Sequence, residues 1–317
     1  MSGKLPEWLR QRALNPSVLI QMEALLDGLS SHTVCEEAHC PNQVQCFSEG
    51  TATFLILGDV CTRNCRFCAI KKGHPLPLDP EEPRNVALAV SKLKLKHVVI
   101  TSVTRDDLVD GGALHFVKTI DAIRQTNSQT TIEVLIPDFQ GSPEALKVVI
   151  DSFPEVINHN VETIPRLYPE VRPEADYRRS TNLLQVAKSM GSGRILTKSG
   201  LMLGLGERHD EVIKVMEDLR EVGCDFLTLG QYLRPSPRHH EVVEYIHPQE
   251  FEAYKHIAEE LGFRAVASSP FVRSSFKAGE MYRGARWLSP PHKEIARAGW
   301  ERESCPDVQR TKRRRLS

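Results

Sequence analysis

A repeated alternation of short β-rich runs and longer amphipathic segments constrains the fold of this chain more than any other feature of its sequence. From residue 52 onward, six runs rich in β-branched residues are each followed by a segment whose apolar residues have helical spacing. The expected strands are Thr53–Leu57, His97–Val103, Thr131–Ile136, Val156–Glu162, Ile195–Leu205 and Phe226–Gln231. The expected helices are Asn85–Leu95, Ala113–Gln125, Pro143–Ser152, Thr181–Met190, Glu211–Glu221 and Glu250–Leu261. This order predicts parallel strands that are joined by right-handed crossovers.

Parallel strands of this kind form either an open doubly wound sheet or a (β/α) barrel. No G-x-G-x-x-G motif follows the first expected strand, so a dinucleotide-binding sheet has little support. The first strand leads directly to Cys61, and both architectures build their sites at the carboxyl ends of the strands. We therefore predict an α/β fold with a partial (β/α)6 TIM-type barrel.

The barrel is expected to cover residues 51–265. Residues 1–50 are expected to form a mostly helical N-terminal extension that ends in a cysteine loop. Its helical spacing is carried by Val18, Leu19, Met22, Leu25 and Leu26. Residues 266–282 are expected to be a C-terminal segment, and residues 283–317 a flexible tail. The basic run at 312–315 is interpreted as part of this solvated end.

The composition excludes several classes of function. The chain has 317 residues, and its 41 Lys and Arg are balanced by 41 Asp and Glu, so no strong net charge attracts it to nucleic acid. Its longest apolar runs fall far short of the roughly 18–20 residues that cross a bilayer. Its first residues contain neither an apolar signal core nor a transit segment rich in Arg and Ser. We therefore expect a cytoplasmic protein that binds neither nucleic acid nor a membrane.

Six of the eight cysteines lie within residues 35–68, in two triplets of different spacing. The first triplet has the spacing C-x4-C-x5-C and consists of Cys35, Cys40 and Cys46. The second has the spacing C-x3-C-x2-C and consists of Cys61, Cys65 and Cys68. A chain of this size does not need disulfides for its core, and nothing in the sequence indicates an oxidising compartment. The triplets are therefore interpreted as metal ligands.

Three thiolates on one short loop suit a four-iron, four-sulfur cluster in which one iron has no cysteine ligand. Structural zinc usually takes four ligands, often in paired C-x2-C knuckles, and neither triplet has that form. The second triplet therefore indicates an iron–sulfur cluster. The first triplet is less diagnostic, because His39 or His32 would complete a zinc site with four ligands. Zinc at the first triplet stays open as an alternative.

Polar residues recur at the carboxyl ends of the expected strands, which converge on one mouth in a barrel. The candidates for contacts with a cofactor or substrate are Asn160, Glu162 and Lys198, followed by the weaker candidates Ser102, Asp106 and Asp107. For each single residue, the ordinary alternative is a helix cap or a hydrogen bond at the end of a strand.

At this point the sequence resembles a known family. Residues 61–68, CTRNCRFC, are similar to the signature of radical S-adenosylmethionine enzymes. Together with CEEAHCPN at residues 35–42, they resemble lipoyl synthases in particular. The resemblance runs from about Leu5 to about Gly279 and includes an Arg-Ser-Ser element at residues 273–275. Two unrelated cysteine spacings and this distant element in the expected order make the resemblance specific.

The resemblance implies that Cys61, Cys65 and Cys68 hold a 4Fe–4S cluster whose open iron binds S-adenosylmethionine. Reduction by one electron then cleaves this cofactor and yields a 5′-deoxyadenosyl radical, which takes hydrogen from an unactivated methylene. It further implies an auxiliary 4Fe–4S cluster, closed by residues 266–282 and held by Cys35, Cys40, Cys46 and Ser275. A serine oxygen is a hard ligand for soft iron, so it would detach as the cluster gives up sulfide.

The implied reaction converts an octanoyl chain into lipoyl by sulfur insertion at carbons 6 and 8. The implied acceptor is octanoyl-lysine on a lipoyl carrier domain, either of a 2-oxoacid dehydrogenase acyltransferase subunit or of the glycine-cleavage H protein. The reaction also needs an electron donor such as ferredoxin or flavodoxin, and an iron–sulfur carrier.

The chain departs from the family pattern at three places. Thr104 stands where the family usually has Asp, Phe47-Ser48 stand where Trp-Gly often follows the third cysteine, and Phe276 stands where the family has Tyr. None of these changes removes an implied metal ligand. The change at Phe47-Ser48 indicates either altered packing around a cluster or a divergent paralogue.

Two other functions fit part of the sequence. A different radical enzyme, acting on a free small molecule or on nucleic acid, shares the second triplet but does not need the first triplet and Ser275 together. A non-catalytic binding protein would instead carry zinc in one or both cysteine loops.

Overall fold

The computed structural model describes residues 5–10, 26, 28–29, 32–37, 40, 42, 46 and 52–287. Most of the expected N-terminal helix, His39, Phe47-Ser48 and the expected tail beyond residue 287 lie outside these residues. The short elements are η1 (Glu7–Leu9), α2 (Val34–Glu37), β3 (Val60–Cys61), β4 (Lys71–Lys72), η2 (Phe139–Gly141), η3 (Pro165–Leu167) and α7 (Tyr168–Val171). Within the described part of the chain, no helix combines the length and the apolar character that a bilayer crossing requires.

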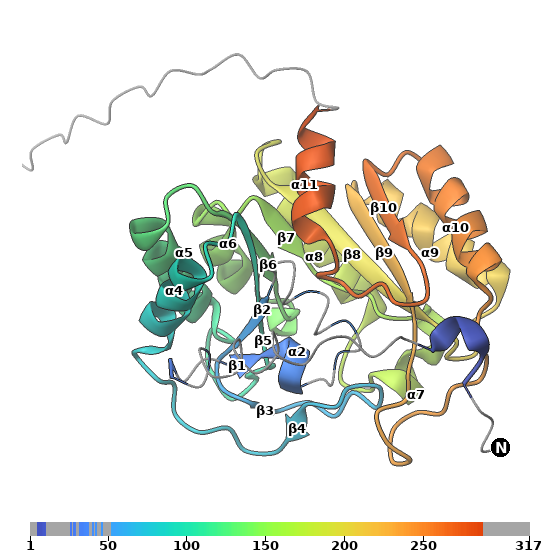
Figure 1. Ribbon diagram of the computed structural model, residues 1–317, viewed down its shortest axis with the longest axis horizontal. Helices are drawn as coiled ribbons and strands as arrows, with labels where there is room; N and C mark the ends of the chain where they lie inside the picture. Colours follow the sequence, from blue (N-terminus) through green and yellow to red (C-terminus); the bar gives the residue numbers. More distant parts are fainter. Residues whose placement is uncertain are drawn as a thin grey trace, which may run out of the picture.

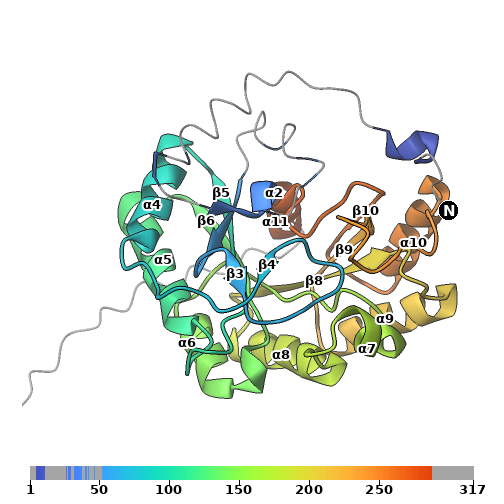
Figure 2. The same ribbon diagram turned by 90° about the horizontal axis from the view of Figure 1, so that it is seen from below.

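Among the described residues, a sheet of eight strands forms the centre of the molecule, in the order β1-β2-β5-β6-β7-β8-β9-β10. The strands are β1 (His32–Thr33), β2 (Thr53–Ile56), β5 (His97–Ser102), β6 (Thr131–Leu135), β7 (Val156–Asn158), β8 (Leu196–Leu203), β9 (Phe226–Gln231) and β10 (Ala265–Ser268). Neighbours from β2 to β10 pair in parallel, and β1 pairs with β2 in the antiparallel sense. The sheet curves into an arc with β1 and β10 at its edges, so the predicted partial barrel is confirmed (Figures 1 and 2).

Six helices of the described chain cover the outside of the arc and follow the parallel strands β2 to β9 in turn (Figure 2). They are α4 (Glu82–Lys92), α5 (Ala113–Thr126), α6 (Pro143–Asp151), α8 (Tyr177–Met190), α9 (His209–Glu221) and α10 (Pro248–Glu260). Ser142 caps α6 by accepting a hydrogen bond from the backbone of Ala145. The buried residues Leu146, Val149 and Ile150 of α6 share one face of the helix, and this face packs against the apolar core. The six predicted strand–helix units are confirmed.

Two strands differ from the expectation. β7 ends at Asn158 rather than at Glu162, and the backbone of Glu162 has a φ of +64°, outside the extended conformation. Glu162 keeps a single bridge to Leu201 of β8. β10 is an additional parallel strand, and its four half-buried residues give too short a run to be recognised in the sequence.

Helix α11 (Ala278–Trp287) covers the amino ends of the strands, opposite to β3 and β4 (Figure 1). It forms an apolar cluster with the first residues of β7, β8 and β9. The cluster consists of Val156, Leu196, Phe226, Met281, Tyr282 and Ala285. The helix continues to Trp287, beyond the expected boundary at residue 282. Since α11 closes this end, the barrel has a floor.

The segment between β10 and α11 crosses the open side of the arc. The hydroxyl of Thr53 in β2 donates a hydrogen bond to the hydroxyl oxygen of Ser275 (2.7 Å). A Cβ atom on Gly230 of β9 would collide with the carbonyl oxygen of Val272, so a glycine is required for the segment to lie this close. These contacts place Ser275 inside the barrel, although the segment to which it belongs starts at the edge strand β10.

Candidate active site

A cavity of about 580 Å³ occupies the interior of the arc and reaches the carboxyl ends of the strands. Both cysteine triplets contribute to its wall. Five of their six cysteines line the cavity, and Ser275 lies on the same wall: Cys35, Cys40, Cys61, Cys65, Cys68 and Ser275. Cys46 does not line the cavity, but it lies near enough to Cys35 to contribute to the raised pKa of that thiol. Residues that are far apart in the sequence are thus gathered around one space.

Three of the cysteine thiols that line this cavity have a raised pKa. Burial, reinforced by the neighbouring Cys40, raises the pKa of Cys35 to about 12. Burial likewise raises the pKa of Cys65 to about 12 and shifts the pKa of Cys68 upward. The described cysteines form no disulfide with one another. Protons must therefore leave these thiols when they bind a metal centre as thiolates.

The arrangement of the thiols of the second triplet suits a cluster better than a single ion. Among the described residues, no three His, Cys, Asp or Glu side chains stand close enough to enclose one metal ion. Zinc needs its ligands around a single point, whereas the thiolates of a four-iron cluster bind different irons and stand farther apart. The second triplet, whose three thiols all line the cavity, fits the second requirement.

The turn that leads from β2 into the second cysteine loop is held by buried charges. Leu57 has a φ of +70°, which is a strained conformation for a branched side chain. Its N–H donates to Glu82 (2.8 Å), and its carbonyl accepts from Arg105 (3.1 Å). His115 adds a contact of 2.6 Å to the Glu82 carboxylate. These partners fix the direction in which the chain enters the loop at Cys61.

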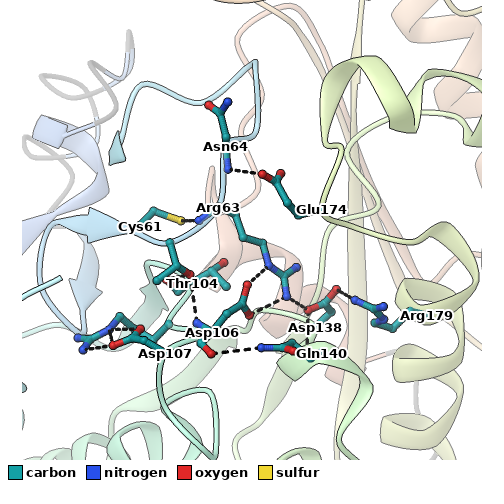
Figure 3. Close-up of polar contacts among 12 residues, drawn as sticks. Cys61, Arg63, Asn64, Thr104, Asp106, Asp107, Asp138, Gln140, Glu174 and Arg179 are labelled. Atoms are coloured by element: carbon teal, nitrogen blue, oxygen red, sulfur yellow. Dashed lines mark hydrogen bonds and ion pairs between the residues drawn. The ribbon is translucent and has the colours of Figure 1, made fainter. Parts of the chain in front are cut away.

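The loop itself is docked on the segment after β5. Both the N–H and the hydroxyl of Thr62 donate to the carbonyl of Thr104, each at 3.0 Å (Figure 3). The hydroxyl of Thr62 in turn accepts from the N–H of Asp106 (3.1 Å). Because Thr104 acts through its backbone carbonyl, its departure from the family pattern leaves this contact intact.

Three of the six candidates for cofactor or substrate contacts line the cavity: Asn160, Glu162 and Ser102. The Asn160 side chain donates to Glu162 (3.1 Å) and to Ser274. The side-chain amide oxygen of Asn160 and the hydroxyl of Ser102 are buried without a hydrogen-bond partner. Burial raises the pKa of Glu162, although Arg172 and Asn160 act in the opposite direction. Buried polar atoms without partners are typical of a place where a polar ligand binds.

Lys198 and Asp106 do not line the cavity, and the side chain of each is engaged elsewhere in the structure. Lys198 is fully buried in the barrel interior, where its ammonium group lies 2.9 Å from a carboxylate oxygen of Glu133. Asn158 donates to the same oxygen (3.1 Å). The carboxylate of Asp106 is occupied by Arg63, and the carboxylate of the weaker candidate Asp107 by Arg105.

A structural role for Lys198 is testable. Lys198→Met would leave the Glu133 carboxylate buried without its closest cation, which costs about 3–5 kcal/mol of unfolding free energy. Urea unfolding of the metal-free protein measures this loss. The double variant Lys198→Met, Glu133→Gln should recover most of it, since no uncompensated charge remains. If Lys198→Met lost S-adenosylmethionine binding while its free energy of unfolding stayed unchanged, the structural role of Lys198 would be contradicted.

Arg172 is a cavity residue that the sequence did not indicate. It lies after α7, is buried, and donates to the backbone carbonyls of Asn160 (2.9 Å) and Val161 (3.1 Å). Its Nε has no hydrogen-bond partner. No motif surrounds it in the sequence, and only the fold brings it beside Asn160 and Glu162. Its positive charge is suited to an acidic group of a ligand.

Comparison with known proteins agrees with this geometry. Residues 55–219 match the Radical SAM superfamily. The chain is 57% identical over 278 residues to the lipoyl synthase of Caldanaerobacter subterraneus subsp. tengcongensis, covering 88% of this chain and 97% of that protein. It is 58% identical over 275 residues to the lipoyl synthase of Alkaliphilus metalliredigens, covering 87% of this chain and 94% of that protein.

Solved structures share the fold at low sequence identity. Methylornithine synthase superposes with a TM-score of 0.50 at 12% identity, covering 87% of this chain and 89% of that one. The FeFe-hydrogenase maturase HydG from Carboxydothermus hydrogenoformans gives 0.52 at 14% identity, covering 86% and 72%. These structures support the fold alone, whereas the sequence relatives define the family. The chain belongs to the lipoyl synthase family of radical S-adenosylmethionine enzymes.

Proposed function

We propose that this protein is a lipoyl synthase that inserts sulfur atoms at carbons 6 and 8 of an octanoyl chain carried on a protein lysine. Its cofactors are S-adenosylmethionine and two 4Fe–4S clusters. The observation that supports this function best is that five of the six cysteines of the two triplets line one cavity together with Ser275. A hydrogen-abstracting centre and a sulfur source must act on the same carbon, so both must face the same space.

We assign the two clusters to the two triplets. Cys61, Cys65 and Cys68 would hold the cluster that binds S-adenosylmethionine. The auxiliary cluster would be held by Cys35, Cys40, Cys46 and Ser275. When bound, the first cluster and S-adenosylmethionine supply hydrogen abstraction from an unactivated carbon, and the auxiliary cluster supplies sulfur.

The protein's own residues bind, orient and shield the reactants. Asn160, Glu162, Ser102 and Arg172 place polar groups on one part of the cavity wall, suited to the polar parts of S-adenosylmethionine. The remaining wall is largely apolar and suits an alkyl chain from which water is excluded. It includes Leu55, Phe67, Leu135, Ile136, Leu201 and Met202.

Positive charges around the opening support a protein-borne substrate. Lys72 and Arg234 line the cavity, yet both are exposed. Lys72 donates to the carbonyl of Cys68 (3.2 Å), and Arg234 donates to the carbonyls of Pro237 (2.6 Å) and His239 (2.9 Å). Neither forms an ion pair with a described carboxylate, so both charges remain available to acidic groups of a carrier domain.

Arg238→Glu tests this docking. Arg238 is exposed in the same loop as Arg234 but does not line the cavity. We expect a KM for the octanoylated carrier domain that is about 3–10-fold higher, with kcat unchanged, because rim charges act on encounter. An octanoyl-lysine peptide should show no change. Lys92→Glu, at the exposed end of α4, is the control for added negative charge. If Arg238→Glu and the wild-type protein had the same KM for the carrier domain, docking at this rim would be contradicted.

The decisive experiment is anaerobic incubation of the reconstituted protein with S-adenosylmethionine, a reductant and an octanoylated carrier domain. The expected product has two sulfur atoms in place of two hydrogens, with roughly two 5′-deoxyadenosines formed per product. Deoxyadenosine without thiolated carrier would favour a different radical enzyme. A colourless protein that contains zinc alone would favour the binding-protein alternative.

The cellular context follows from the same proposal. We place the protein in the cytoplasm, with a ferredoxin or a flavodoxin as electron donor and an iron–sulfur carrier that restores the spent auxiliary cluster. Acceptors are the acyltransferase subunits of 2-oxoacid dehydrogenases and the glycine-cleavage H protein.

A further inference from the structure

The loop from Cys61 to Cys68 is anchored by a side chain that is not a cysteine. Arg63 is only 5% exposed and makes a two-pronged contact with the Asp106 carboxylate, through Nε (2.6 Å) and Nη2 (2.9 Å). The same Nη2 lies 2.6 Å from Oδ1 of Asp138 (Figure 3). One guanidinium therefore joins the cysteine loop to the segments that follow β5 and β6.

Asp138 is the centre of this network. Its carboxylate is fully buried and also contacts Arg179 of α8 (3.2 Å) and the backbone N–H of Gln140 (3.0 Å). Burial alone would raise the pKa of Asp138, but the hydrogen bond from Arg63 holds it well below its usual range. Asp138 therefore presents a permanent negative charge to Arg63.

Asp106 holds the loop through its backbone as well as its side chain. Its carboxylate binds Arg63, and its N–H donates to the hydroxyl of Thr62. Thr62 and Arg63, which are adjacent in the loop, are thus both held by Asp106 of the neighbouring strand–helix unit. None of these contacts involves a thiol of the cluster-binding triplet.

We propose that Arg63 is a positioning residue that fixes the Cys61–Cys68 loop in its cluster-binding conformation before any cluster is present. This inference rests on the proposed function for the identity of the cluster. A loop that is already ordered does not lose conformational freedom when it binds, so the cluster is held more tightly and at a defined depth in the cavity. Arginine suits this role, because its planar fork makes a two-pronged contact with Asp106 and still reaches Asp138, a geometry that a lysine ammonium does not reproduce.

Thiol alkylation of the metal-free, reduced protein tests the proposal without any cluster or turnover. Arg63→Met is expected to accelerate alkylation of Cys61 and Cys65 by at least about fivefold, since the loop loses its anchor. Loss of a cation does not favour the thiolate, so faster labelling reports exposure rather than reactivity. Cys35 serves as the internal reference and should keep its rate. Arg63→Lys should be intermediate.

The second readout is spectroscopic. After reconstitution, Arg63→Met should retain the auxiliary cluster, while the electron paramagnetic resonance signal of the reduced first cluster should respond less to added S-adenosylmethionine. Lys188→Met is the matched control, since Asp225 keeps a second cation, Arg264, just as Asp138 would keep Arg179. This control should lower stability without changing the labelling of Cys61 or the signal.

A second variant keeps the test decisive if Arg63→Met unfolds the whole protein. Asp106→Asn leaves Asp138 paired with Arg63 and should still accelerate labelling of Cys61 and Cys65. Wild-type labelling in Asp106→Asn, or in a folded Arg63→Met protein, would overturn the proposal. Because labelling is measured on metal-free protein, failure of the lipoyl synthase assay would leave this result standing, and the two failures are distinguishable.

Discussion

Replacement of Cys65 by alanine is expected to abolish both cleavage of S-adenosylmethionine and lipoyl formation. Cys65 is one of three thiols that line the cavity on the loop after β2, and the proposed cluster has no spare thiolate among them. Without the cluster, no side chain of the cavity can deliver an electron to a sulfonium, since general acids and bases lack the redox chemistry. We expect activity below detection rather than a graded loss.

Iron analysis distinguishes the loss of one cluster from the loss of both. The wild-type protein should contain about eight irons per chain, and Cys65→Ala about four, because the auxiliary site has its own ligands. Cys224→Ala is the matched control, since Cys224 is a buried cysteine outside the cavity and should keep the full iron content. Retention of all iron in Cys65→Ala would contradict the assignment of the second triplet.

Ser275→Cys is expected to separate cleavage of S-adenosylmethionine from the insertion of sulfur. Ser275 faces the cavity, where its oxygen accepts a hydrogen bond from Thr53. A thiolate is a softer and stronger ligand for iron than a serine oxygen, so it should not detach when sulfide is required. We expect cleavage of S-adenosylmethionine to continue while lipoyl formation falls by at least about 100-fold, as for removal of a group used only in the productive step.

Product ratios check this expectation. The measurement is 5′-deoxyadenosine and thiolated carrier from the same anaerobic reaction, reported as a ratio. Thr53→Val removes the hydrogen bond to Ser275 but leaves its hydroxyl in place, and it should lower lipoyl formation much less. Full lipoyl formation by Ser275→Cys would favour a radical enzyme that does not draw sulfur from a cluster at this serine.

The sequence was sufficient for the barrel because apolar periodicity and strand–helix order are local signals. Strands β2, β5, β6, β7, β8 and β9 all lie within the expected ranges, although β7 is shorter than expected and ends at Asn158. β10 escaped recognition, since four half-buried residues carry no alternation. The φ of Glu162 and the length of α11 depend on tertiary packing, which a single sequence does not display.

Within the candidate site, spacing singles out the cysteines as candidate ligands, whereas depth along a strand is visible only in the structure. Lys198 seemed to belong to the mouth because polar residues surround it in the sequence. Its strand register pairs it with Asn158 and with Phe226, the first residue of β9, so it lies toward the barrel floor. Asp106 has the expected position, yet Arg63 occupies its carboxylate. Charge pairing between distant segments cannot be read from either segment alone.

The end of the described chain has a consequence for proteolysis. Residues 266–287 bring Ser275 into the barrel and then form the floor at α11. A protein clipped after Ser275 would keep that serine but present Leu196 and Phe226 to water. Such a fragment would self-associate before any defect in sulfur chemistry became measurable, so degradation from this end should show first as loss of soluble protein.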